Sequence, residues 1–265
     1  MEASTLRKLI HLSFIVALSL PFIFPINIPI SVNKSTQDAY NTVESIPEGS
    51  IALINFDFST QSAPEVYPQA LAFLKHAIRR HFKFVITTFE SPDAVLYAKQ
   101  ALASVDLTGY KYGKDYVHLG YFPGKETSIS AFGRDVHGLV KTDADGSSIV
   151  DMPLMQQIQS AKDISIWLIG SYNSQPFITQ IYAPYNAIMI SASDGSSYQS
   201  LYTYYQSKQL KGLLNGARGG AEYEGLLGYA GQAKAIMNVQ NFSHVFFIGA
   251  IVIGNIIYFR RGKKQ

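Results

Sequence analysis

Apolar and uncharged positions gather at the two ends of the chain, whereas the middle alternates short apolar runs with polar segments. The C-terminal run, Phe242 to Phe259, has no charged residue when His244 is neutral, and four cations follow it within residues 260–265. As a helix this run rises about 27 Å, close to the ~30 Å hydrocarbon thickness of a bilayer. The pattern predicts a transmembrane helix over residues 239–259 and a basic cytoplasmic tail over 260–265.

The N-terminal run, residues 9–30, is uncharged and follows Arg7 and Lys8. It suits either a retained signal anchor or a cleaved secretory signal peptide. The run is longer than a typical signal-peptide core and no A-x-A-like cleavage site follows it, which favours the anchor. Prolines at 21, 25 and 29 interrupt helical hydrogen bonding, so we expect a span from Leu6 to Phe24 with an extended exit. Residues 1–30 are thus predicted as a cytoplasmic tip and an N-terminal transmembrane anchor.

Basic residues beside the two apolar runs indicate the orientation of the chain. Cytoplasmic flanks of membrane spans are enriched in Lys and Arg, and both outer flanks here are basic. We therefore expect a two-pass cell-membrane protein with both termini in the cytoplasm and the central domain outside it.

The central segment begins with a polar stretch, residues 31–50, which we predict as a linker with a short helix over 37–46. Residues 51–238 are predicted as an extracytoplasmic α/β domain. Residues 51–58 form an apolar run of the kind that suits a strand buried on both faces. A helix over 64–81, a strand over 82–89 and a helix over 93–104 then complete βαβ units, which form parallel sheets.

The second half of the domain is less regular. We expect residues 105–150 to be an inserted segment with one or two short strands, because seven glycines interrupt its apolar pieces. Further predicted elements are helices over 151–160, 176–185 (or a loop and helix) and 196–209, with strands over 164–169 and 187–191. The predicted fold class is α/β, a Rossmann-like, mostly parallel sheet flanked by helices, between an N-terminal and a C-terminal transmembrane helix.

Seven of the 21 residues from Lys211 to Gly231 are glycine. Small residues allow close packing of helices, whereas glycine-rich loops can also bind anions, and we favour close packing. The acidic residues of this stretch are expected to bind amides or form a salt bridge rather than act in catalysis. In the last span, a small-xxx-small pair and a neighbouring amide could join the two spans of one chain or spans of neighbouring chains. The packing or partner candidates are Gly212, Gly216, Gly219, Gly220, Glu222, Glu224, Ala250, Gly254 and Asn255.

The formal charge of +3 is unevenly divided, since residues 1–8 contribute +1 and residues 260–265 contribute +4, leaving −2 between them. Nucleic-acid binding is therefore poorly supported. Only 15% of the residues are charged, which favours a membrane protein with one folded domain. The chain has no cysteine, and this excludes cysteine chemistry.

Ligands of open parallel sheets bind outside the carboxyl ends of the strands. The side chains at those ends also cap the helices that follow, and this simpler role is the alternative for each of them. The ligand-rim candidates are Asp57, Ser59, Glu90, Ser91, Ser171, Ser191 and Asp194.

Known catalytic and cofactor motifs fit poorly. Residues 120–126 lack the spacing and the hydroxyl residue of a phosphate loop, and residues 216–220 lack the dinucleotide-binding glycine order. Residues 191–195 approach a nucleophile elbow without its first glycine. The histidines have no metal-ligand spacing. The sequence thus indicates no cofactor, no metal and no assignable catalytic residue.

Four stretches resemble a group of uncharacterised prokaryotic two-span membrane proteins: residues 113–117 (GKDYV), 133–135 (GRD), 151–155 (DMPLM) and 212–224. The resemblance implies the same anchored extracytoplasmic α/β layout and transfers no catalytic residue.

These observations favour a non-enzymatic binding or scaffold module within a membrane protein assembly, with a membrane protein or a second copy as its partner. The alternative is a membrane-tethered hydrolase or transferase whose site lies at the carboxyl ends of the parallel strands.

Overall fold

The computed structural model describes residues 3–23 and 31–262. The chain divides into two units, one of residues Ser31–Ala233 and one that combines Met1–Ile30 with Lys234–Gln265. The first unit contains the sheet, and the second contains the N-terminal and C-terminal apolar helices.

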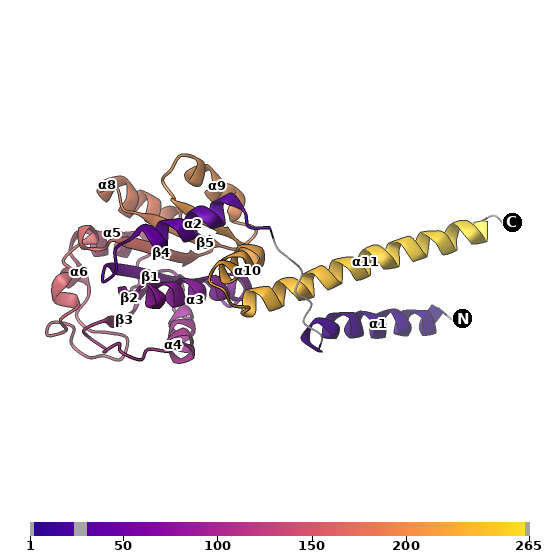
Figure 1. Cartoon of the computed structure of the whole chain (residues 1–265), viewed down its shortest axis with the longest axis horizontal. Helices are drawn as coiled ribbons and strands as arrows, with labels where there is room; N and C mark the ends of the chain where they lie inside the picture. Colours follow the sequence, from indigo (N-terminus) through magenta and orange to yellow (C-terminus); the bar gives the residue numbers. More distant parts are fainter. Residues whose placement is uncertain (1–2, 24–30, 263–265) are drawn as a thin grey trace. The chain divides into compact units, whose positions relative to one another are not determined.

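The first unit is built on a six-stranded sheet in which every neighbouring pair is parallel, in the order β3-β2-β1-β4-β5-β6 (Figure 1). This is the strand order of Rossmann-like folds, so the predicted α/β class is confirmed. The strands are β1 (Ile51–Asp57), β2 (Lys83–Thr88), β3 (Tyr116–Tyr121), β4 (Ile166–Ser171), β5 (Met189–Ser193) and β6 (Gly212–Asn215).

The central strands are apolar on both faces because helices cover both faces of the sheet. In β1, Ala52, Ile54 and Phe56 belong to one hydrophobic core, whereas Leu53 belongs to the other. Strand β4 alternates in the same way, with Leu168 in the first core and Trp167 in the second. This two-sided burial explains why the sequence shows continuous apolar runs here.

Four helices cover the first face: α2 (Lys34–Ser45), α3 (Ala63–Arg79), α4 (Ala94–Ser104) and α10 (Gly216–Leu226). Shorter elements cover the second face. They are α5 (Glu126–Arg134), α6 (Val136–Leu139), the 3-10 turns η1 (Met155–Gln157) and η2 (Ala161–Asp163), α7 (Gln175–Phe177), the π-helical turn η3 (Ile178–Tyr182), α8 (Ala183–Tyr185) and α9 (Tyr198–Gln206).

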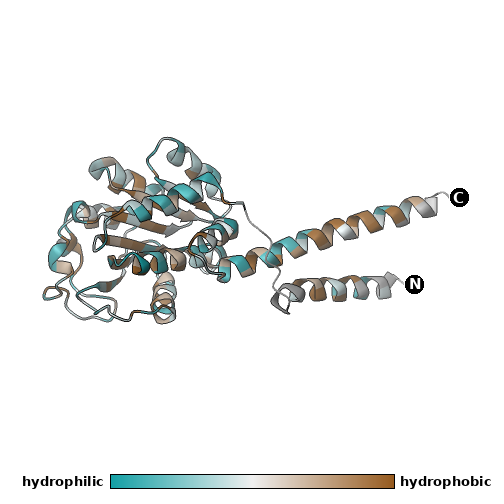
Figure 2. Cartoon of the chain, viewed as in Figure 1, coloured by the Kyte–Doolittle hydropathy of each residue, from teal (hydrophilic) through white to brown (hydrophobic). Residues whose placement is uncertain are grey.

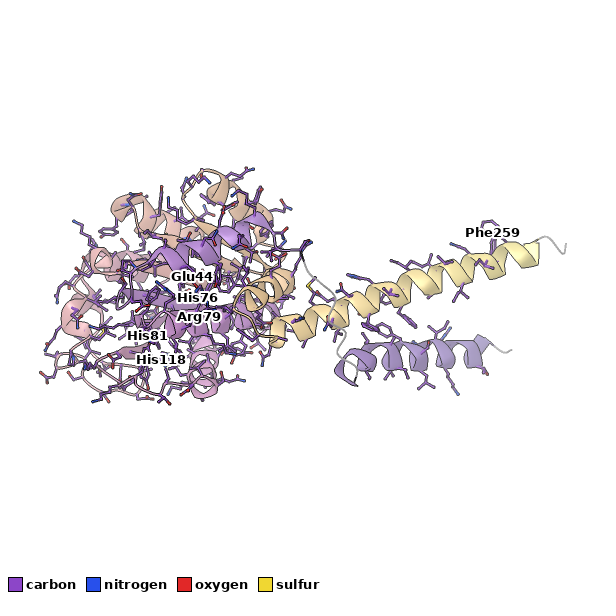
Figure 3. The ribbon with its side chains drawn as sticks, viewed as in Figure 1. Glu44, His76, Arg79, His81, His118 and Phe259 are labelled. Atoms are coloured by element: carbon purple, nitrogen blue, oxygen red, sulfur yellow. The ribbon has the colours of Figure 1, made fainter. Side chains whose placement is uncertain are left out.

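A buried polar contact joins three helices of the first face. His76 of α3 is fully buried, with Nδ1 2.7 Å from the hydroxyl of Tyr223 in α10 and Nε2 3.1 Å from Glu44 in α2 (Figure 3). Burial lowers the pKa of His76 to about 4, so its imidazole is neutral at physiological pH. This contact therefore fixes α2, α3 and α10 against each other.

The structure corrects several sequence expectations. Residues 31–50 are no free linker, because Ala39 and Val43 of α2 are fully buried in the first core. The segment 105–150 supplies β3, a full member of the sheet, together with α5 and α6. Residues 151–160 form turns and η1 rather than the predicted helix, and Pro153 lies in their first half.

The second unit contains α1 (Ala3–Ile23) and most of α11 (Gln232–Gly262). Within the described residues, α11 is the one helix long and apolar enough to cross a bilayer, over Gln232–Ile256, and Figure 2 shows apolar residues along much of it. Several of its large apolar side chains, among them Val245, Ile248 and Ile251, are exposed. Helix α1 has a shorter apolar stretch, Ile10–Ser19. The ring of Phe14 lies 5.4 Å from that of Phe246, so α1 and α11 contact each other.

The expectations for the N-terminal exit and the tail fall partly outside the described residues. Helix α1 ends at Ile23, two residues after Pro21. The predicted extended exit and the last two lysines of the tail lie in the ranges 24–30 and 263–265, which the structure does not describe.

Candidate functional site

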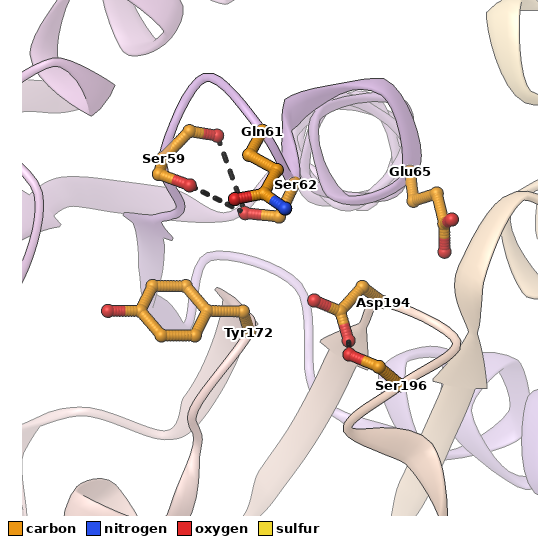
Figure 4. A pocket seen from close by; sticks show the side chains of 7 residues that line it. All are labelled: Ser59, Gln61, Ser62, Glu65, Tyr172, Asp194 and Ser196. Carbon is orange, nitrogen blue, oxygen red and sulfur yellow. Dashed lines mark hydrogen bonds between the residues drawn. The ribbon is translucent and has the colours of Figure 1, made fainter.

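The order of the strands reverses between β1 and β4, because the chain builds β1 to β3 outward on one side and returns to place β4 on the other. Loops on either side of such a point diverge and leave a crevice beyond the strand ends. A hollow of about 400 Å³ lies there, between the loop after β1 and the loops after β4 and β5 (Figure 4). Its lining residues are Ser59, Gln61, Ser62, Glu65, Tyr172, Asp194 and Ser196. We call it the cleft.

The upper wall of the cleft is the turn that connects β1 to α3. The carbonyl of Ser59 accepts hydrogen bonds from the backbone N–H groups of Ser62, at 3.1 Å, and Ala63, at 2.9 Å. Pro64 then occupies the first turn of α3, where its missing N–H removes no helical hydrogen bond. The turn thus presents Ser59 and Ser62 side by side, their hydroxyl oxygens 3.4 Å apart.

Glu65, in the first turn of α3, crosses to the loop after β5. Its Oε2 accepts a hydrogen bond from the backbone N–H of Gly195, at 2.8 Å. A Cβ at Gly216 would lie 2.6 Å from the same oxygen, and Gly216 has a φ of +51°. Glycine at 216 therefore provides both the backbone conformation and the space that place this carboxylate.

Asp194 lies on the opposite wall, just after β5. Its Oδ1 accepts hydrogen bonds from the hydroxyl of Ser196, at 2.9 Å, and from the backbone N–H of Ser197, at 2.8 Å. These bonds close a tight turn before α9 and hold the carboxylate at the cleft.

Tyr172 follows β4 and faces the cleft from below the Ser59–Ser62 turn (Figure 4). Burial, followed by the charge of Glu90, raises the pKa of its phenol to about 12. Its hydroxyl is therefore protonated at physiological pH and can donate a hydrogen bond.

Asp57 ends β1, two residues before Ser59, but it is fully buried and does not line the cleft. Its Oδ1 accepts hydrogen bonds from the backbone N–H groups of Phe89, at 2.7 Å, and Glu90, at 2.8 Å, and its Oδ2 accepts one from Asn55. Burial raises the pKa of the Asp57 carboxyl to about 7, although these hydrogen bonds oppose the shift. Asp57 therefore links the carboxyl ends of β1 and β2.

The rim candidates divide between the cleft and the core. Ser59 and Asp194 line the cleft. Ser171 is buried and accepts a hydrogen bond from the N–H of Asn173, and the hydroxyl of Ser191 is buried 2.7 Å from that of Ser174. Glu90 and Ser91 follow β2, are partly buried and do not line the cleft.

Five lining residues were not among the sequence candidates: Gln61, Ser62, Glu65, Tyr172 and Ser196. Each lies in a loop or first helical turn beyond the strand end. The strand-end rule would have found them if it had been extended by one helical turn.

Helix α10 carries the second group of predicted residues, and Glu222 is nearly fully buried there. Its Oε1 accepts hydrogen bonds from Arg218, at 2.8 Å, and from the side chain of Asn33, at 3.0 Å. Its Oε2 accepts hydrogen bonds from Thr36, at 2.7 Å, and from the backbone N–H of Asn33, at 3.1 Å. Glu222 therefore holds the N-terminus of α2, where a negative charge is favourable.

Glu224 has the same role at the start of α11. Its Oε2 accepts a hydrogen bond from the N–H of Gly231, at 3.0 Å, and its Oε1 accepts one from Ala233, at 3.1 Å. Both acidic residues of the glycine-rich stretch therefore bind backbone amides.

The glycines of this stretch that were packing candidates lie at close contacts. A Cβ at Gly212 would overlap the backbone of Ala39 in α2, and one at Gly219 would lie 2.9 Å from the carbonyl carbon of Leu214. A Cβ at Gly220 would lie 2.7 Å from Ala233. Here the absence of side chains permits close packing.

The small pair in α11 is placed differently. A Cβ at Gly254 would meet no described atom within 4 Å, and Asn255 is exposed. Among the described residues, the pair formed by Ala250 and Gly254 is therefore not the contact between α1 and α11.

Over residues 3–23 and 31–262, no three histidine, aspartate or glutamate side chains are grouped closely enough to hold a metal ion. No protein-family model matches the sequence, and no curated protein matches it significantly.

Proposed function

We propose that this chain is a membrane-anchored binding module whose α/β domain lies outside the cytoplasm and whose cleft receives a small ligand. The observation that carries this proposal is the cleft itself, where polar side chains from three loops converge at the point of strand-order reversal. Its volume of about 400 Å³ falls within the range of ~300–1,000 Å³ for small-molecule sites.

Binding is favoured over catalysis by the surroundings of the cleft hydroxyls. A serine nucleophile needs a base within hydrogen-bonding reach. Among the described lining residues there is no histidine or lysine, and the hydroxyl of Ser62 donates to the carbonyl of Ser59. The hydroxyl of Ser196 does donate to the carboxylate of Asp194, but the same oxygen also accepts from the N–H of Ser197, so this contact closes the turn before α9.

One observation favours the rival, a membrane-tethered hydrolase or transferase. The pKa of Asp57, about 7, suits a general base at neutral pH. Its carboxylate, however, is fully buried and both oxygens accept hydrogen bonds within the protein. We therefore place catalysis second.

The absence of cysteine allows a direct test, since one introduced cysteine is the only thiol of the chain. Thr60→Cys places an environment-sensitive fluorophore on an exposed residue next to Ser59, beside the cleft but outside its lining, and Ser200→Cys places it on the exposed side of α9 as a matched control. We expect the dialysable small-molecule fraction of the source cells to change the emission of the first variant only. An equal or absent response contradicts the binding proposal, and consumption of a component with release of a product supports the rival.

We propose that α1 and α11 are two membrane spans. The 21 residues of α1 rise about 32 Å in total, and their apolar stretch, Ile10–Ser19, rises about 15 Å, so as a span Arg7 and Lys8 would reach toward the headgroups. Large apolar side chains of both helices are exposed, among them Leu12 and Ile15 of α1 and Ile251 and Ile253 of α11. Lipid is the solvent that accepts such surfaces.

Labelling of single cysteines tests the orientation. With a membrane-impermeant maleimide on intact cells, Lys162→Cys in the exposed part of the domain should react, and Lys264→Cys in the basic tail should react only after permeabilisation. The reverse pattern would show that the domain is cytoplasmic.

We further propose that α11 binds a helix of a second copy or of another membrane protein. The side of α11 around Gly254 is uncontacted among the described residues and carries a small pair that permits close approach. In mild detergent the native chain should form a particle larger than the monomer, and Gly254→Leu should reduce it to the monomer. A monomeric native chain contradicts this proposal, and the particle mass distinguishes a second copy from another protein.

A further inference from the structure

The described side chains that line the cleft carry negative charge and no positive charge. Two of its seven lining residues, Glu65 and Asp194, are carboxylates, and none of these seven described residues is cationic. Resting on the proposed binding function, we infer that the ligand is a small organic amine that enters the cleft as a cation.

Glu65 excludes the ligand that Rossmann-like folds usually bind at this position. In those folds a phosphate group lies at the N-terminus of the first helix after β1, where the helix dipole and free N–H groups favour an anion. Here the first turn of α3 carries the Glu65 carboxylate, which repels a phosphate.

The position of the Glu65 carboxylate is set by two neighbouring glycines. The N–H of Gly195 holds Oε2 at 2.8 Å, and only a residue without a side chain at 216 leaves this oxygen its space. The charge is thus pre-oriented at the cleft before a ligand arrives, which lowers the entropic cost of binding.

Asp194 supplies the second negative charge. The hydroxyl of Ser196 and the N–H of Ser197 both donate to its Oδ1. This arrangement leaves Oδ2 as the oxygen that can accept a charge-assisted hydrogen bond from an ammonium group.

Tyr172 adds an aromatic surface on the same side as Asp194 (Figure 4). An ammonium group within about 6 Å of an aromatic face is attracted by the ring. The Tyr172 hydroxyl is hydrogen-bonded to Glu90 and points away from Asp194 (Figure 4), so the neutral ring is the part of this side chain that a ligand would meet.

The remaining lining groups are neutral. Ser59, Ser62 and Gln61 offer hydroxyl and amide groups on the upper wall. They can bind hydroxyl groups of the ligand but cannot neutralise a second charge. The arrangement favours an amine that also carries hydroxyl groups, as an amino sugar does.

The test uses the full-length chain in detergent micelles with the fluorophore on Thr60→Cys, which leaves all seven lining residues unchanged. Glucosamine and glucose form a matched pair, because they differ by one ammonium group in place of a hydroxyl, with spermidine as a second cation and ADP as an anion. We expect glucosamine and spermidine to change the emission at concentrations at least about tenfold lower than glucose, and ADP to have no effect. Added salt should weaken the response, because part of the attraction is between charges near the surface.

Charge-neutralising variants locate the effect. Glu65→Gln and Asp194→Asn should each weaken glucosamine binding by about tenfold or more. Glu126→Gln is the control, because it makes the same change of net charge at an exposed position outside the cleft. Glu65→Gln could also weaken binding by loosening the loop after β5, which Glu65 contacts through Gly195. Asp194→Asn with the melting temperature of the native chain then provides the test in a folded protein.

The outcomes separate this inference from the proposed function. Equal binding of glucose and glucosamine, or binding of ADP, overturns the amine inference and leaves the cleft a binding site. A response to the small-molecule fraction without any response to the two amines also overturns the amine inference and leaves the cleft a binding site. No response to either overturns the proposed function.

Discussion

Replacement of Glu222 by alanine tests whether this side chain of α10 fixes the N-terminus of α2 to the domain. The substitution removes four hydrogen bonds, from Arg218, Thr36 and the backbone and side chain of Asn33. Thr36 is almost fully buried, so its hydroxyl is left without this acceptor, whereas the side chain of Arg218 is 47% exposed and can be solvated.

The expected loss follows from these contacts. A buried donor left without its acceptor costs about 1–3 kcal/mol, and a favourable charge at a helix N-terminus contributes about 0.3–1 kcal/mol. We therefore expect Glu222→Ala to lower the free energy of unfolding by about 3 kcal/mol. For a domain of this size such a change lowers the melting temperature by about 9 °C.

The only tryptophan provides the assay. Trp167 lies in β4 and is fully buried, so its emission reports the unfolding of the sheet in detergent micelles. Glu48→Ala is the matched control, because the Glu48 side chain is 64% exposed and its ion pair with Arg80, at 3.8 Å, contributes little.

The two variants should differ clearly. If Glu222→Ala and Glu48→Ala melt within about 2 °C of each other, the Glu222 contacts do not fix α2 and the reasoning is wrong. Glu222→Gln keeps one acceptor oxygen and should fall between the native chain and Glu222→Ala.

Two further results are expected. Because the pKa of Asp57 is raised to about 7, the folded state retains a proton between about pH 4 and 7 that the unfolded chain has lost, so this group's contribution to stability falls as pH rises through that range. Urea unfolding of Asp57→Asn at several pH values should lack this part of the slope, up to about 4 kcal/mol; an identical slope in the native chain and the variant contradicts the assignment. Gly212→Ala should destabilise the domain by about 1–3 kcal/mol in the same assay, because its Cβ overlaps Ala39, whereas Gly225→Ala, whose Cβ meets nothing within 4 Å, should be neutral or stabilising. Equal effects of the two glycine substitutions would show that α2 can move away from β6 at no cost.

The strands that the sequence predicts are those in which burial dominates. Strands β1, β2, β4 and β5 lie close to predicted apolar runs, because both faces of each are covered by helices. The pattern misses β6, which has four residues and begins with a glycine, and it treats β3 as one short piece of an irregular segment. Short strands depend on their neighbours in the sheet, and that information is absent from local sequence.

Helix α10 shows the opposite limit. Four of its eleven residues are glycine, which disfavours a helix on intrinsic propensity. The helix forms because the glycines allow it to approach β6 and the start of α11, and because Tyr223 fills the first core. Tertiary packing thus overrides local preference.

The candidates taken from the sequence coincide only partly with the residues that line the cleft. The strand-end rule points to the edge of the sheet at which the cleft lies and includes two of its lining residues, Ser59 and Asp194. It misses Glu65 and Tyr172 because the orientation of a side chain beyond the strand end depends on the following turn. Asp57 was a reasonable candidate by position, but it bonds to the loop after β2 and lies in the core.

The contact between Glu222 and Asn33 also orders events during synthesis. These residues are 189 positions apart, so α2 leaves the ribosome long before its binding site on β6 and α10 exists. A nascent chain that ends before residue 212 lacks the strand that packs against Ala39 of α2. The domain therefore completes its core only when almost the whole chain has been made, and until then α2 exposes apolar side chains that other proteins can bind.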